Sequence, residues 1–263
     1  MTTTSYLAFD LGASSGRAML GRFAGGRLEL SEVHRFTNGA KEIDGALFWD
    51  FEALWTEIKT GLRLALKQAP ALAGIGVDTW GVDYVLLKPD GAFARLPYMY
   101  RDQRNLGADE RVYQRISPEE LYRRTGLQFM PFNTIFQLFV HREQHPEDLA
   151  GTTLLMMPDA IVYRLSGATA CEYTDASTTE LLDVRARDWD FDLIDRLGLP
   201  RSLFPRLAMP GAPAGVLRPE LQRELKCGPV PVWYVPVVGL FELRHLGLAG
   251  HRTGRTQAHR RRS

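Results

Sequence analysis

The 263-residue sequence predicts an α/β fold with one mixed sheet flanked by helices. Three apolar runs separated by glycine-containing turns open the chain, a stretch with helical periodicity follows, and a further apolar run comes after it. Short turns of this kind join antiparallel strands, whereas a helix between two strands is typical of a crossover onto the same sheet. We therefore expect three antiparallel N-terminal strands, then a helix, then another strand of the same sheet.

The first strand and the turn after it indicate a phosphate site. Residues 6–9 are apolar, Asp10 follows them, and a second strand begins at Arg17. Successive backbone N–H groups in a glycine- and serine-rich turn make a concave anion site, and a carboxylate beside it can hold a divalent cation. The residues expected to contact phosphate are Ala13, Ser14, Ser15, Gly16 and Arg17. An ordinary hairpin with a polar turn remains the alternative, since no P-loop motif occurs in the chain.

The next elements follow in order. Residues 24–27 give a hairpin signal, residues 28–36 a third strand, and residues 43–49 a linker or edge strand. Asp50 is expected to cap a helix that ends before Pro70. Its apolar residues recur at helical spacing and predict a core-facing stripe. That stripe consists of Leu54, Ile58, Leu62 and Leu66.

A second polar cluster lies in residues 74–87, where Asp78, Trp80, Gly81 and Asp83 separate two apolar runs. In open α/β sheets the ends of strands face the ligand crevice. This combination suits a sugar. The two carboxylates can accept hydrogen bonds from its hydroxyls, the indole gives an apolar face, and the glycine allows close approach of the backbone. The alternative is that Asp78 and Asp83 bracket a surface turn.

The remaining chain predicts more helices and a last strand at residues 230–238. Ser117 followed by Pro118 predicts the start of a helix, and Gly126 predicts its end. His141 and His145 lie four apart on another helix, a spacing that can bind zinc, but no third ligand is in register. We expect a solvated helix face there. Residues 172–179 are interpreted as a loop rich in capping residues, without assigned chemistry.

Arg101 and Asp102 leave two interpretations open. They either hydrogen-bond a substrate or form an ion pair that ties a strand to the next helix.

Composition restricts the class of protein. Hydrophobic residues make up 45% and charged residues 24%, as in globular proteins. The two cysteines, Cys171 and Cys227, favour a reducing compartment, and no apolar run is long enough to span a bilayer. No secretory signal is visible at the N-terminus. We therefore expect a cytoplasmic protein with no membrane partner.

Charge is unevenly distributed along the chain. Residues 243–263 contain six arginines, three histidines and no acidic residue, which leaves 26 basic against 31 acidic residues elsewhere, a net charge of −5. The interpretations of this tail are attraction to nucleic acid, a disordered end, or translation in a wrong reading frame. A basic arm without a basic folded module predicts only salt-sensitive attraction, so no nucleic-acid partner is expected. We expect one domain over 1–238 and a disordered or non-native tail over 239–263.

Two strings of the sequence resemble a known family. Asp-Leu-Gly-Ala-Ser-Ser-Gly-Arg at 10–17 and Asp-Thr-Trp-Gly-Val-Asp at 78–83 are similar to rhamnulokinases, a branch of the FGGY carbohydrate kinases. The three antiparallel strands with a phosphate turn also resemble the actin-like, ribonuclease H-like ATPase domain. This resemblance runs from residue 6 to about 238. It implies ATP-dependent phosphorylation of the 1-hydroxyl of L-rhamnulose, with Mg²⁺.

The resemblance also implies roles for single residues. Asp10 would hold the metal, and the turn from Ala13 to Arg17 would contact the phosphates of ATP. Gly81 would contact the ketose, and Trp80 and Asp83 would line its pocket. These positions match the family's motifs residue by residue.

The resemblance ends after the last predicted strand. The family has a His-Asp-Thr segment there, whose aspartate is the general base, followed by a second domain that carries the adenosine site. Here no aspartate follows Asp195, and Glu242 is the only carboxylate after Val238. We therefore assign no catalytic residue and expect a truncated or frameshifted, inactive kinase chain. The alternative is a non-catalytic sugar- or phosphate-binding fragment. A domain separated from its partner exposes apolar surface, so self-association is expected.

Overall fold

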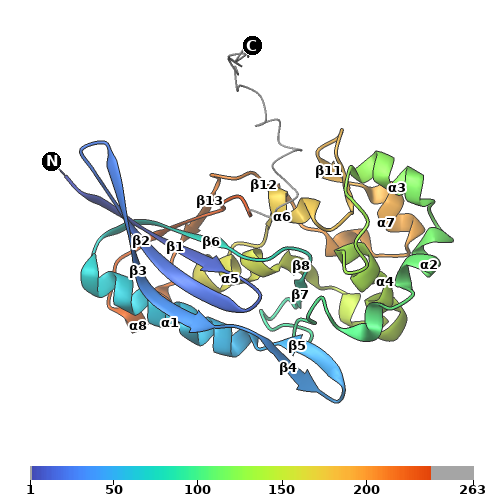
Figure 1. Cartoon of the computed structure of the whole chain (residues 1–263), viewed down its shortest axis with the longest axis horizontal. Helices are drawn as coiled ribbons and strands as arrows, with labels where there is room; N and C mark the ends of the chain where they lie inside the picture. The colour runs from blue at the N-terminus through green and yellow to red at the C-terminus, as the bar shows by residue number, and fades with distance from the viewer. Residues whose placement is uncertain (1, 238–263) are drawn as a thin grey trace, which may run out of the picture.

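The computed structural model describes residues 2–237, and its centre is a six-stranded mixed sheet (Figure 1). The strand order is β13-β14-β6-β1-β2-β3. These strands are β1 (Thr4–Leu11), β2 (Ser15–Ala24), β3 (Arg27–Thr37), β6 (Leu72–Asp78), β13 (Pro213–Val216) and β14 (Pro231–Trp233). β1, β2 and β3 are antiparallel neighbours, and β6 is parallel to β1. The predicted order of strands at the N-terminus is confirmed.

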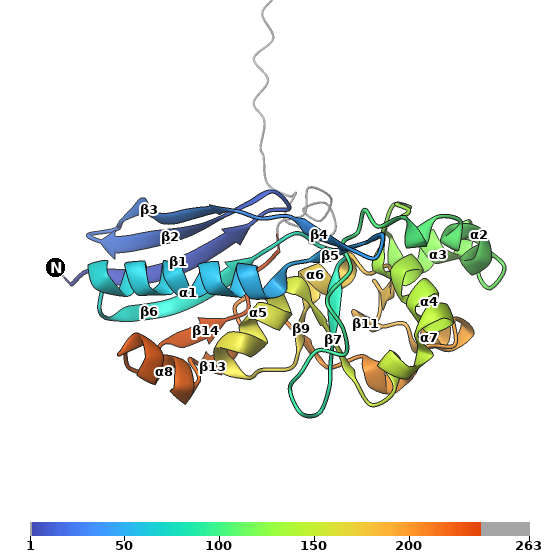
Figure 2. The same cartoon turned by 90° about the horizontal axis from the view of Figure 1, so that it is seen from below.

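Helix α1 (Phe51–Gln68) covers one face of this sheet, as Figure 2 shows. It begins where predicted, because the Asp50 side chain accepts a hydrogen bond from the Ala53 N–H. Its predicted stripe is buried. Gly61 allows close contact, since a Cβ there would lie 2.9 Å from Ala18 Cβ and from Phe9 Cε1. Helices α5 (Met157–Ser166) and α8 (Pro219–Leu225) complete this part of the molecule, which we call the sheet lobe.

The second part, the helical lobe, is built mainly from short helices and lies beside the sheet lobe (Figure 1). Its elements are α2 (Ala108–Tyr113), α3 (Pro118–Thr125), α4 (Thr134–Gln144), α7 (Phe191–Arg196), β10 (Leu182–Asp183) and β11 (Asp188–Trp189). Helix α3 has the predicted ends: Ser117 accepts from the Glu120 N–H, and Gly126 adopts a left-handed conformation with φ 66°. Helix α4 buries Phe136 and Phe139.

A two-stranded ribbon joins the two lobes. It pairs β7 (Tyr84–Leu87) with β8 (Thr153–Met156). Successive side chains of a strand point to opposite faces, so each face of the ribbon enters a different core. Val85 and Leu87 belong to the core of the sheet lobe, whereas Tyr84 and Leu86 belong to that of the helical lobe. The ribbon therefore gives both cores a common wall.

The smaller elements connect these parts. They are β4 (Ala40–Ile43), β5 (Ala46–Trp49), β9 (Cys171–Glu172), α6 (Tyr173–Ser177), β12 (Leu207–Ala208), and the 3₁₀ turns Gln103–Asn105, Pro146–Leu149 and Arg201–Leu203. β4 and β5 form a hairpin of their own where a linker or single edge strand was expected. β14 is shorter than the predicted strand at 230–238. Pro236, which has no N–H to donate, follows soon after it.

One interpretation from the sequence is wrong. His141 was expected on a solvated helix face, but it is only 2% exposed and lies between two partners. Its Nδ1 is 3.0 Å from the Tyr84 hydroxyl and its Nε2 is 3.1 Å from Asp148 Oδ2. Burial lowers the pKa of His141 to about 4, although the hydrogen bond that His141 donates to Asp148 opposes this. Its hydrogen bonds are to protein groups, and no cluster of three metal-ligating side chains occurs within residues 2–237.

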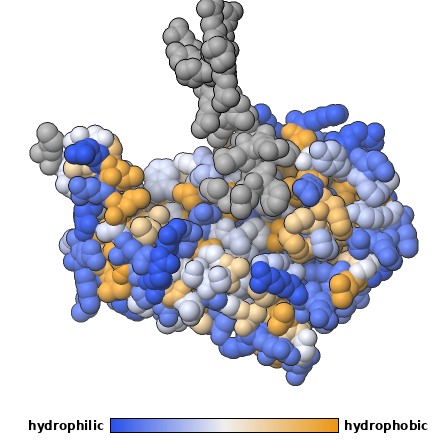
Figure 3. Space-filling view, viewed as in Figure 1, coloured by the Kyte–Doolittle hydropathy of each residue, from blue (hydrophilic) through white to orange (hydrophobic). Residues whose placement is uncertain are grey.

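The sheet face opposite α1 is open and apolar in the part of the chain that the structure describes. Leu30 is 65% exposed there, with Tyr6, Leu28 and Trp233 also exposed. Space-filling colours show apolar residues gathered over the β2–β3 hairpin (Figure 3). Within residues 2–237, none of the helices has the length and apolar character needed to span a bilayer.

Candidate functional site

The predicted phosphate turn and the predicted sugar loop meet at one edge of the sheet. β1 and β6 run in parallel with Asp10 opposite Asp78, so both strands end at the same level. The turn after β1 and the loop after β6 therefore leave the sheet side by side. Carboxyl ends of parallel strands are the usual place for ligands in α/β folds. The sequence left Asp78 either as one of two carboxylates suited to a sugar or as a bracket of a surface turn; its place beside Asp10 comes from the register.

Asp10 and Arg17 form an ion pair across the β1–β2 hairpin. Arg17 Nη2 lies 2.5 Å from Asp10 Oδ2, and Arg17 Nε donates to the same oxygen at 2.7 Å. Both side chains are almost half exposed, so a ligand can reach them. Since a carboxylate binds cations and a guanidinium binds phosphate oxygens, a phosphate–cation complex can engage both groups in place of their mutual pair.

The turn between β1 and β2 is held by backbone hydrogen bonds and by Asn38. The Gly12 N–H donates to the Ser15 carbonyl at 2.8 Å, and Asn38 Nδ2 donates to the Gly12 carbonyl at 2.9 Å. Ser14 and Ser15 are exposed, while Gly16 is buried. A Cβ at Gly16 would lie 2.4 Å from the Phe36 ring, so this position has no room for a side chain. The turn is therefore a fixed polar surface beside Asp10.

The loop after β6 contacts helix α6, which the sequence had not identified. A Cβ on Gly81 would lie 2.9 Å from Thr178 Cγ2 and 3.2 Å from Asp175 Oδ1. The Val82 N–H donates to Thr178 Oγ1 at 3.0 Å, and Val82 has the left-handed φ of 70°. Only glycine allows residue 81 to approach this closely. The loop thus brings a buried carboxylate, Asp175, next to Gly81.

Segment 172–179, expected as a loop, is mostly helical and buried. The Glu172 carboxylate accepts hydrogen bonds from the N–H groups of Thr174 and Asp175 and so starts α6. Burial raises the pKa of Glu172, against these hydrogen bonds. The Val237 N–H donates to Thr174 Oγ1 at 2.9 Å. The end of the described chain therefore also lies at this edge. The general-base position expected after Val238 and the tail at 239–263 lie outside the described residues.

Asp83 differs from its expected role. It is 0% exposed, and Oδ2 accepts hydrogen bonds from the indoles of Trp49 and Trp80 at 2.6 and 3.1 Å. The Tyr100 N–H also donates to Oδ2, and Gln137 Nε2 donates to Oδ1 at 2.9 Å. Burial raises the pKa of Asp83 to about 6, while these donors oppose the shift. Asp83 therefore positions the loop from beneath and does not line a pocket; of the two predicted lining residues, only Trp80 is partly exposed.

Asp102 contacts backbone N–H groups and the side chain of Arg104, whose Nε lies 4.0 Å from Asp102 Oδ1. Its carboxylate accepts hydrogen bonds from the N–H groups of Leu47 and Arg104 at 2.7 and 2.8 Å. It therefore starts the 3₁₀ turn Gln103–Asn105 and ties it to β5. Arg101 lies next to it, with its guanidinium 5.1 Å from the centre of the Tyr100 ring.

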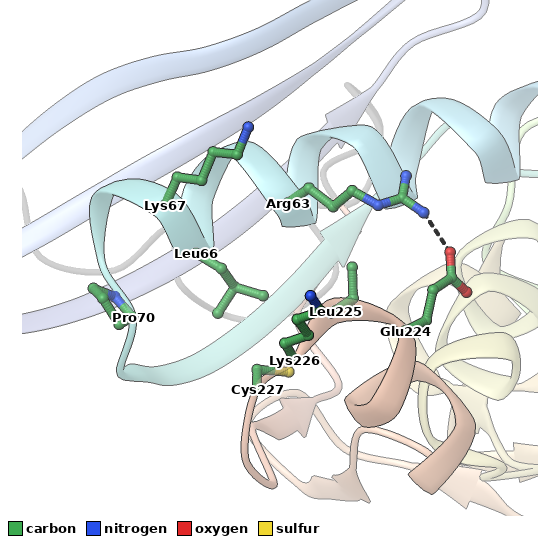
Figure 4. A pocket seen from close by; sticks show the side chains of 8 residues that line it. All are labelled: Arg63, Leu66, Lys67, Pro70, Glu224, Leu225, Lys226 and Cys227. Atoms are coloured by element: carbon green, nitrogen blue, oxygen red, sulfur yellow. Dashed lines mark hydrogen bonds and ion pairs between the residues drawn. The ribbon is translucent and has the colours of Figure 1, made fainter.

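A pocket of about 280 Å³ lies elsewhere, between α1 and α8 (Figure 4). Leu66 and Leu225 form its apolar part, and Lys226 and Cys227 lie at its side. The guanidinium of Arg63 forms an ion pair with Glu224 across it, and Lys59 pairs with the same carboxylate. This pocket lies between two surface helices, and none of the predicted site residues lines it.

Comparison with known proteins identifies a family. Residues 5–239 match the N-terminal domain of the FGGY family of carbohydrate kinases. The chain is 41% identical over 251 residues to the rhamnulokinase of Bacteroides thetaiotaomicron and 45% identical over 218 residues to that of Pectobacterium atrosepticum. These alignments cover 95% and 82% of this chain but 49% and 44% of the two relatives. The chain thus spans about half the length of the curated relatives it matches.

Solved structures show the same fold. The gluconate kinase of Lactobacillus acidophilus superposes with a TM-score of 0.79 at 17% identity, over 91% of this chain and 49% of that one. The glycerol kinase of Plasmodium falciparum, determined with ADP, superposes with a TM-score of 0.74 at 16% identity, over 89% of this chain and 48% of that one. The predicted actin-like ATPase architecture is confirmed. By its sequence match over residues 5–239, the chain belongs to the FGGY family of carbohydrate kinases.

Proposed function

We propose that this chain carries the sugar- and phosphate-binding half of an ATP-dependent ketose kinase, acting on the 1-hydroxyl of L-rhamnulose. The observation that carries the proposal is the register of Asp10 with Asp78, because it brings the phosphate turn and the Gly81 loop to one sheet edge. The identities of 41% and 45% to rhamnulokinases support this choice of sugar.

The residues at the turn suit ATP with Mg²⁺. Asp10 would hold the metal, directly or through water, since hard cations prefer oxygen ligands. The backbone and hydroxyl groups of Ala13, Ser14, Ser15 and Gly16, with the guanidinium of Arg17, would bind phosphate oxygens. When bound, Mg²⁺ neutralises phosphate charge. The protein's part is to hold both reactants in place, which supplies much of the rate enhancement in phosphoryl transfer.

The loop after β6 would bind the sugar. Gly81 would give a hydroxylated substrate access to the backbone, and the partly exposed Trp80 would offer an apolar surface. Asp83 holds the Trp80 indole through its Nε1 and so acts as a positioning residue. Asp175, which is buried next to Gly81, is a second positioning residue beneath this loop, as Asp83 is.

Turnover needs a base that takes the proton from the attacking hydroxyl. General-base catalysis typically supplies about 10²–10⁴-fold in rate. We assign no residue of this chain to that role, since no aspartate follows Asp195. Binding without turnover is therefore the expected behaviour of the chain, which also describes the second candidate function, a non-catalytic sugar- or phosphate-binding fragment.

The test combines calorimetry with a coupled assay of ADP release. We expect L-rhamnulose to bind the full chain, and Gly81→Val, which would clash with Thr178, to abolish that binding. No ADP release above background is expected. Absence of sugar binding by the folded wild-type chain would refute the proposed sugar site, and measurable turnover would refute the assignment of the base.

Two further properties belong to the proposal. The open sheet face, with Leu28, Leu30, Tyr6 and Trp233, fits a second copy of the chain, and we expect association in size-exclusion chromatography. A concentration-independent monomer would contradict this. Cys171 and Cys227 are both free, which suits a cytoplasmic protein; fractionation of cells that express the chain would test this location.

A further inference from the structure

A second cavity, of about 500 Å³, lies in the helical lobe, away from the proposed kinase site. It opens between α3 and residues 127–129. Most of its walls are apolar or aromatic, and carboxylates are the only charged groups among the lining residues. These residues are Tyr113, Pro118, Glu119, Leu121, Tyr122, Leu127, Gln128, Phe129 and Glu180.

Glu180 is the unusual member of this wall. It is only 2% exposed, and its Oε2 accepts a hydrogen bond from Asn133 Nδ2 at 2.9 Å. Within residues 2–237, no hydrogen bond to Oε1 and no ion pair to this carboxylate is present. Its backbone φ is 62°, a left-handed conformation that residues with a Cβ rarely adopt. The fold thus holds a buried carboxylate at the cavity with one oxygen available.

The electrostatics show that the Glu180 carboxylate has no positively charged partner among the described residues. Burial raises the pKa of Glu180 to about 7, and the hydrogen bond from Asn133 reverses only part of that shift. Burial raises the pKa of Tyr113 to about 12, and the nearby carboxylates of Glu180 and Asp109 add to this shift. A positive group in the cavity would relieve both effects, because an opposite charge favours the ionised carboxylate.

The aromatic walls favour the same kind of ligand. The rings of Tyr113 and Phe129 lie 6.1 Å apart, and Phe129 lies 5.6 Å from Phe136 behind it. Tyr122 is exposed at the same opening. Faces of aromatic rings attract cations, and the apolar part of an organic cation is buried against them at the same time. An anion would be repelled by Glu119 and Glu180.

We propose that this cavity binds a small organic cation with a primary ammonium group. The ammonium donates an N–H to Glu180 Oε1, and the hydrocarbon part lies against Tyr113, Tyr122 and Phe129. The Glu119 carboxylate, on α3, adds a second negative charge to the site. A neutral apolar molecule fits less well because it would leave Oε1 without a donor.

The test uses the full chain, benzylammonium as the probe and benzyl alcohol as its neutral counterpart of nearly the same shape. Amide NMR spectra of the labelled chain are recorded during each titration. We expect saturable shifts at residues 127–129 and 180, with a Kd of about 1 mM for benzylammonium. Benzyl alcohol should bind at least roughly tenfold more weakly.

Two variants separate charge from shape. Glu180→Gln keeps the size of the side chain and a partner for Asn133 but removes the charge, and should weaken benzylammonium binding roughly tenfold while leaving benzyl alcohol unchanged. Phe129→Leu keeps an apolar wall without a ring and should weaken benzylammonium binding less than Glu180→Gln does. Equal affinity for the two probes, no saturable shift at these residues, or unchanged binding by a folded Glu180→Gln chain would each overturn the proposal.

Discussion

The two lobes bury their apolar residues in different ways. The sheet lobe packs α1 and α5 against one face of its sheet and leaves the opposite face open, and its proposed functional groups lie at the end of the strands. The helical lobe encloses its core on more sides and buries polar groups within it, among them His141 and Glu180. The comparison teaches that the lobe with the simpler core carries the proposed chemistry. Buried carboxylates occur in both lobes, since Asp159 on α5 is only 1% exposed and burial raises its pKa well above the ordinary value.

The contact between the lobes is the most sensitive point. The Asp83 carboxylate accepts hydrogen bonds from Trp49 in the sheet lobe and from Gln137 in the helical lobe, and Asp83→Ala removes this shared acceptor. Because buried donors would be left without partners, we expect the free energy of unfolding to fall by about 3–5 kcal/mol. Urea unfolding followed by circular dichroism measures it. Asp83→Asn, which retains one acceptor oxygen, is the control and should lose less. A loss under about 1 kcal/mol in the alanine variant would show that Asp83 does not join the lobes.

Matched truncations in the two cores test whether the lobes unfold together. Ile58→Ala in the sheet lobe and Leu138→Ala in the helical lobe each remove a fully buried side chain. Each should cost about 2–5 kcal/mol through lost burial and a cavity. Since both cores share the β7–β8 ribbon, we expect one cooperative transition for both variants, observed equally by tryptophan fluorescence and circular dichroism. Two separated transitions in either variant would mean that the lobes are independent units.

Acidity should change the stability of the helical lobe through Glu180. The pKa of Glu180 is about 7 in the folded chain against an ordinary value of 4.5, so folding favours its protonated form. Its contribution is fully present below pH 4.5 and is lost as the pH rises to about 7. Relative to Glu180→Gln, the wild-type chain should therefore lose about 3 kcal/mol of stability across that range. Unfolding titrations of both chains at several pH values measure this difference. A constant difference would contradict it.

The smallest expected effect on stability lies at the proposed phosphate turn. The ion pair of Arg17 with Asp10 is almost half exposed, so Arg17→Ala should change the free energy of unfolding by no more than about 1 kcal/mol. Affinity for ATP with Mg²⁺, measured by calorimetry, should nevertheless fall, because a phosphate contact is lost. Arg17→Lys, which keeps the charge, should retain part of it. Unchanged ATP affinity in Arg17→Ala would remove Arg17 from the proposed site.

Much of the fold could be predicted from local signals. The cap at Asp50, the ends of the helix from Ser117 to Gly126 and the three N-terminal strands all appear in the structure. The misassigned positions had no local signal. His141 looks like a polar residue on a helix, and only its pairing with Asp148 and Tyr84 makes it a core residue. Glu180 received no assignment from the sequence, because nothing in its neighbours along the chain indicates that it is buried.

By itself, the sequence determined the order of the three N-terminal strands and the residue types at the turn from Asp10 to Arg17, because consecutive strands joined by short turns pair with one another. It also carried the motifs of the family. Tertiary structure alone decided that Asp78 lies opposite Asp10, that Asp175 reaches Gly81 and that Asp83 is buried. Each of these facts joins segments distant in sequence. Their burial and spacing are set by strand register and by packing between lobes, which no local pattern encodes.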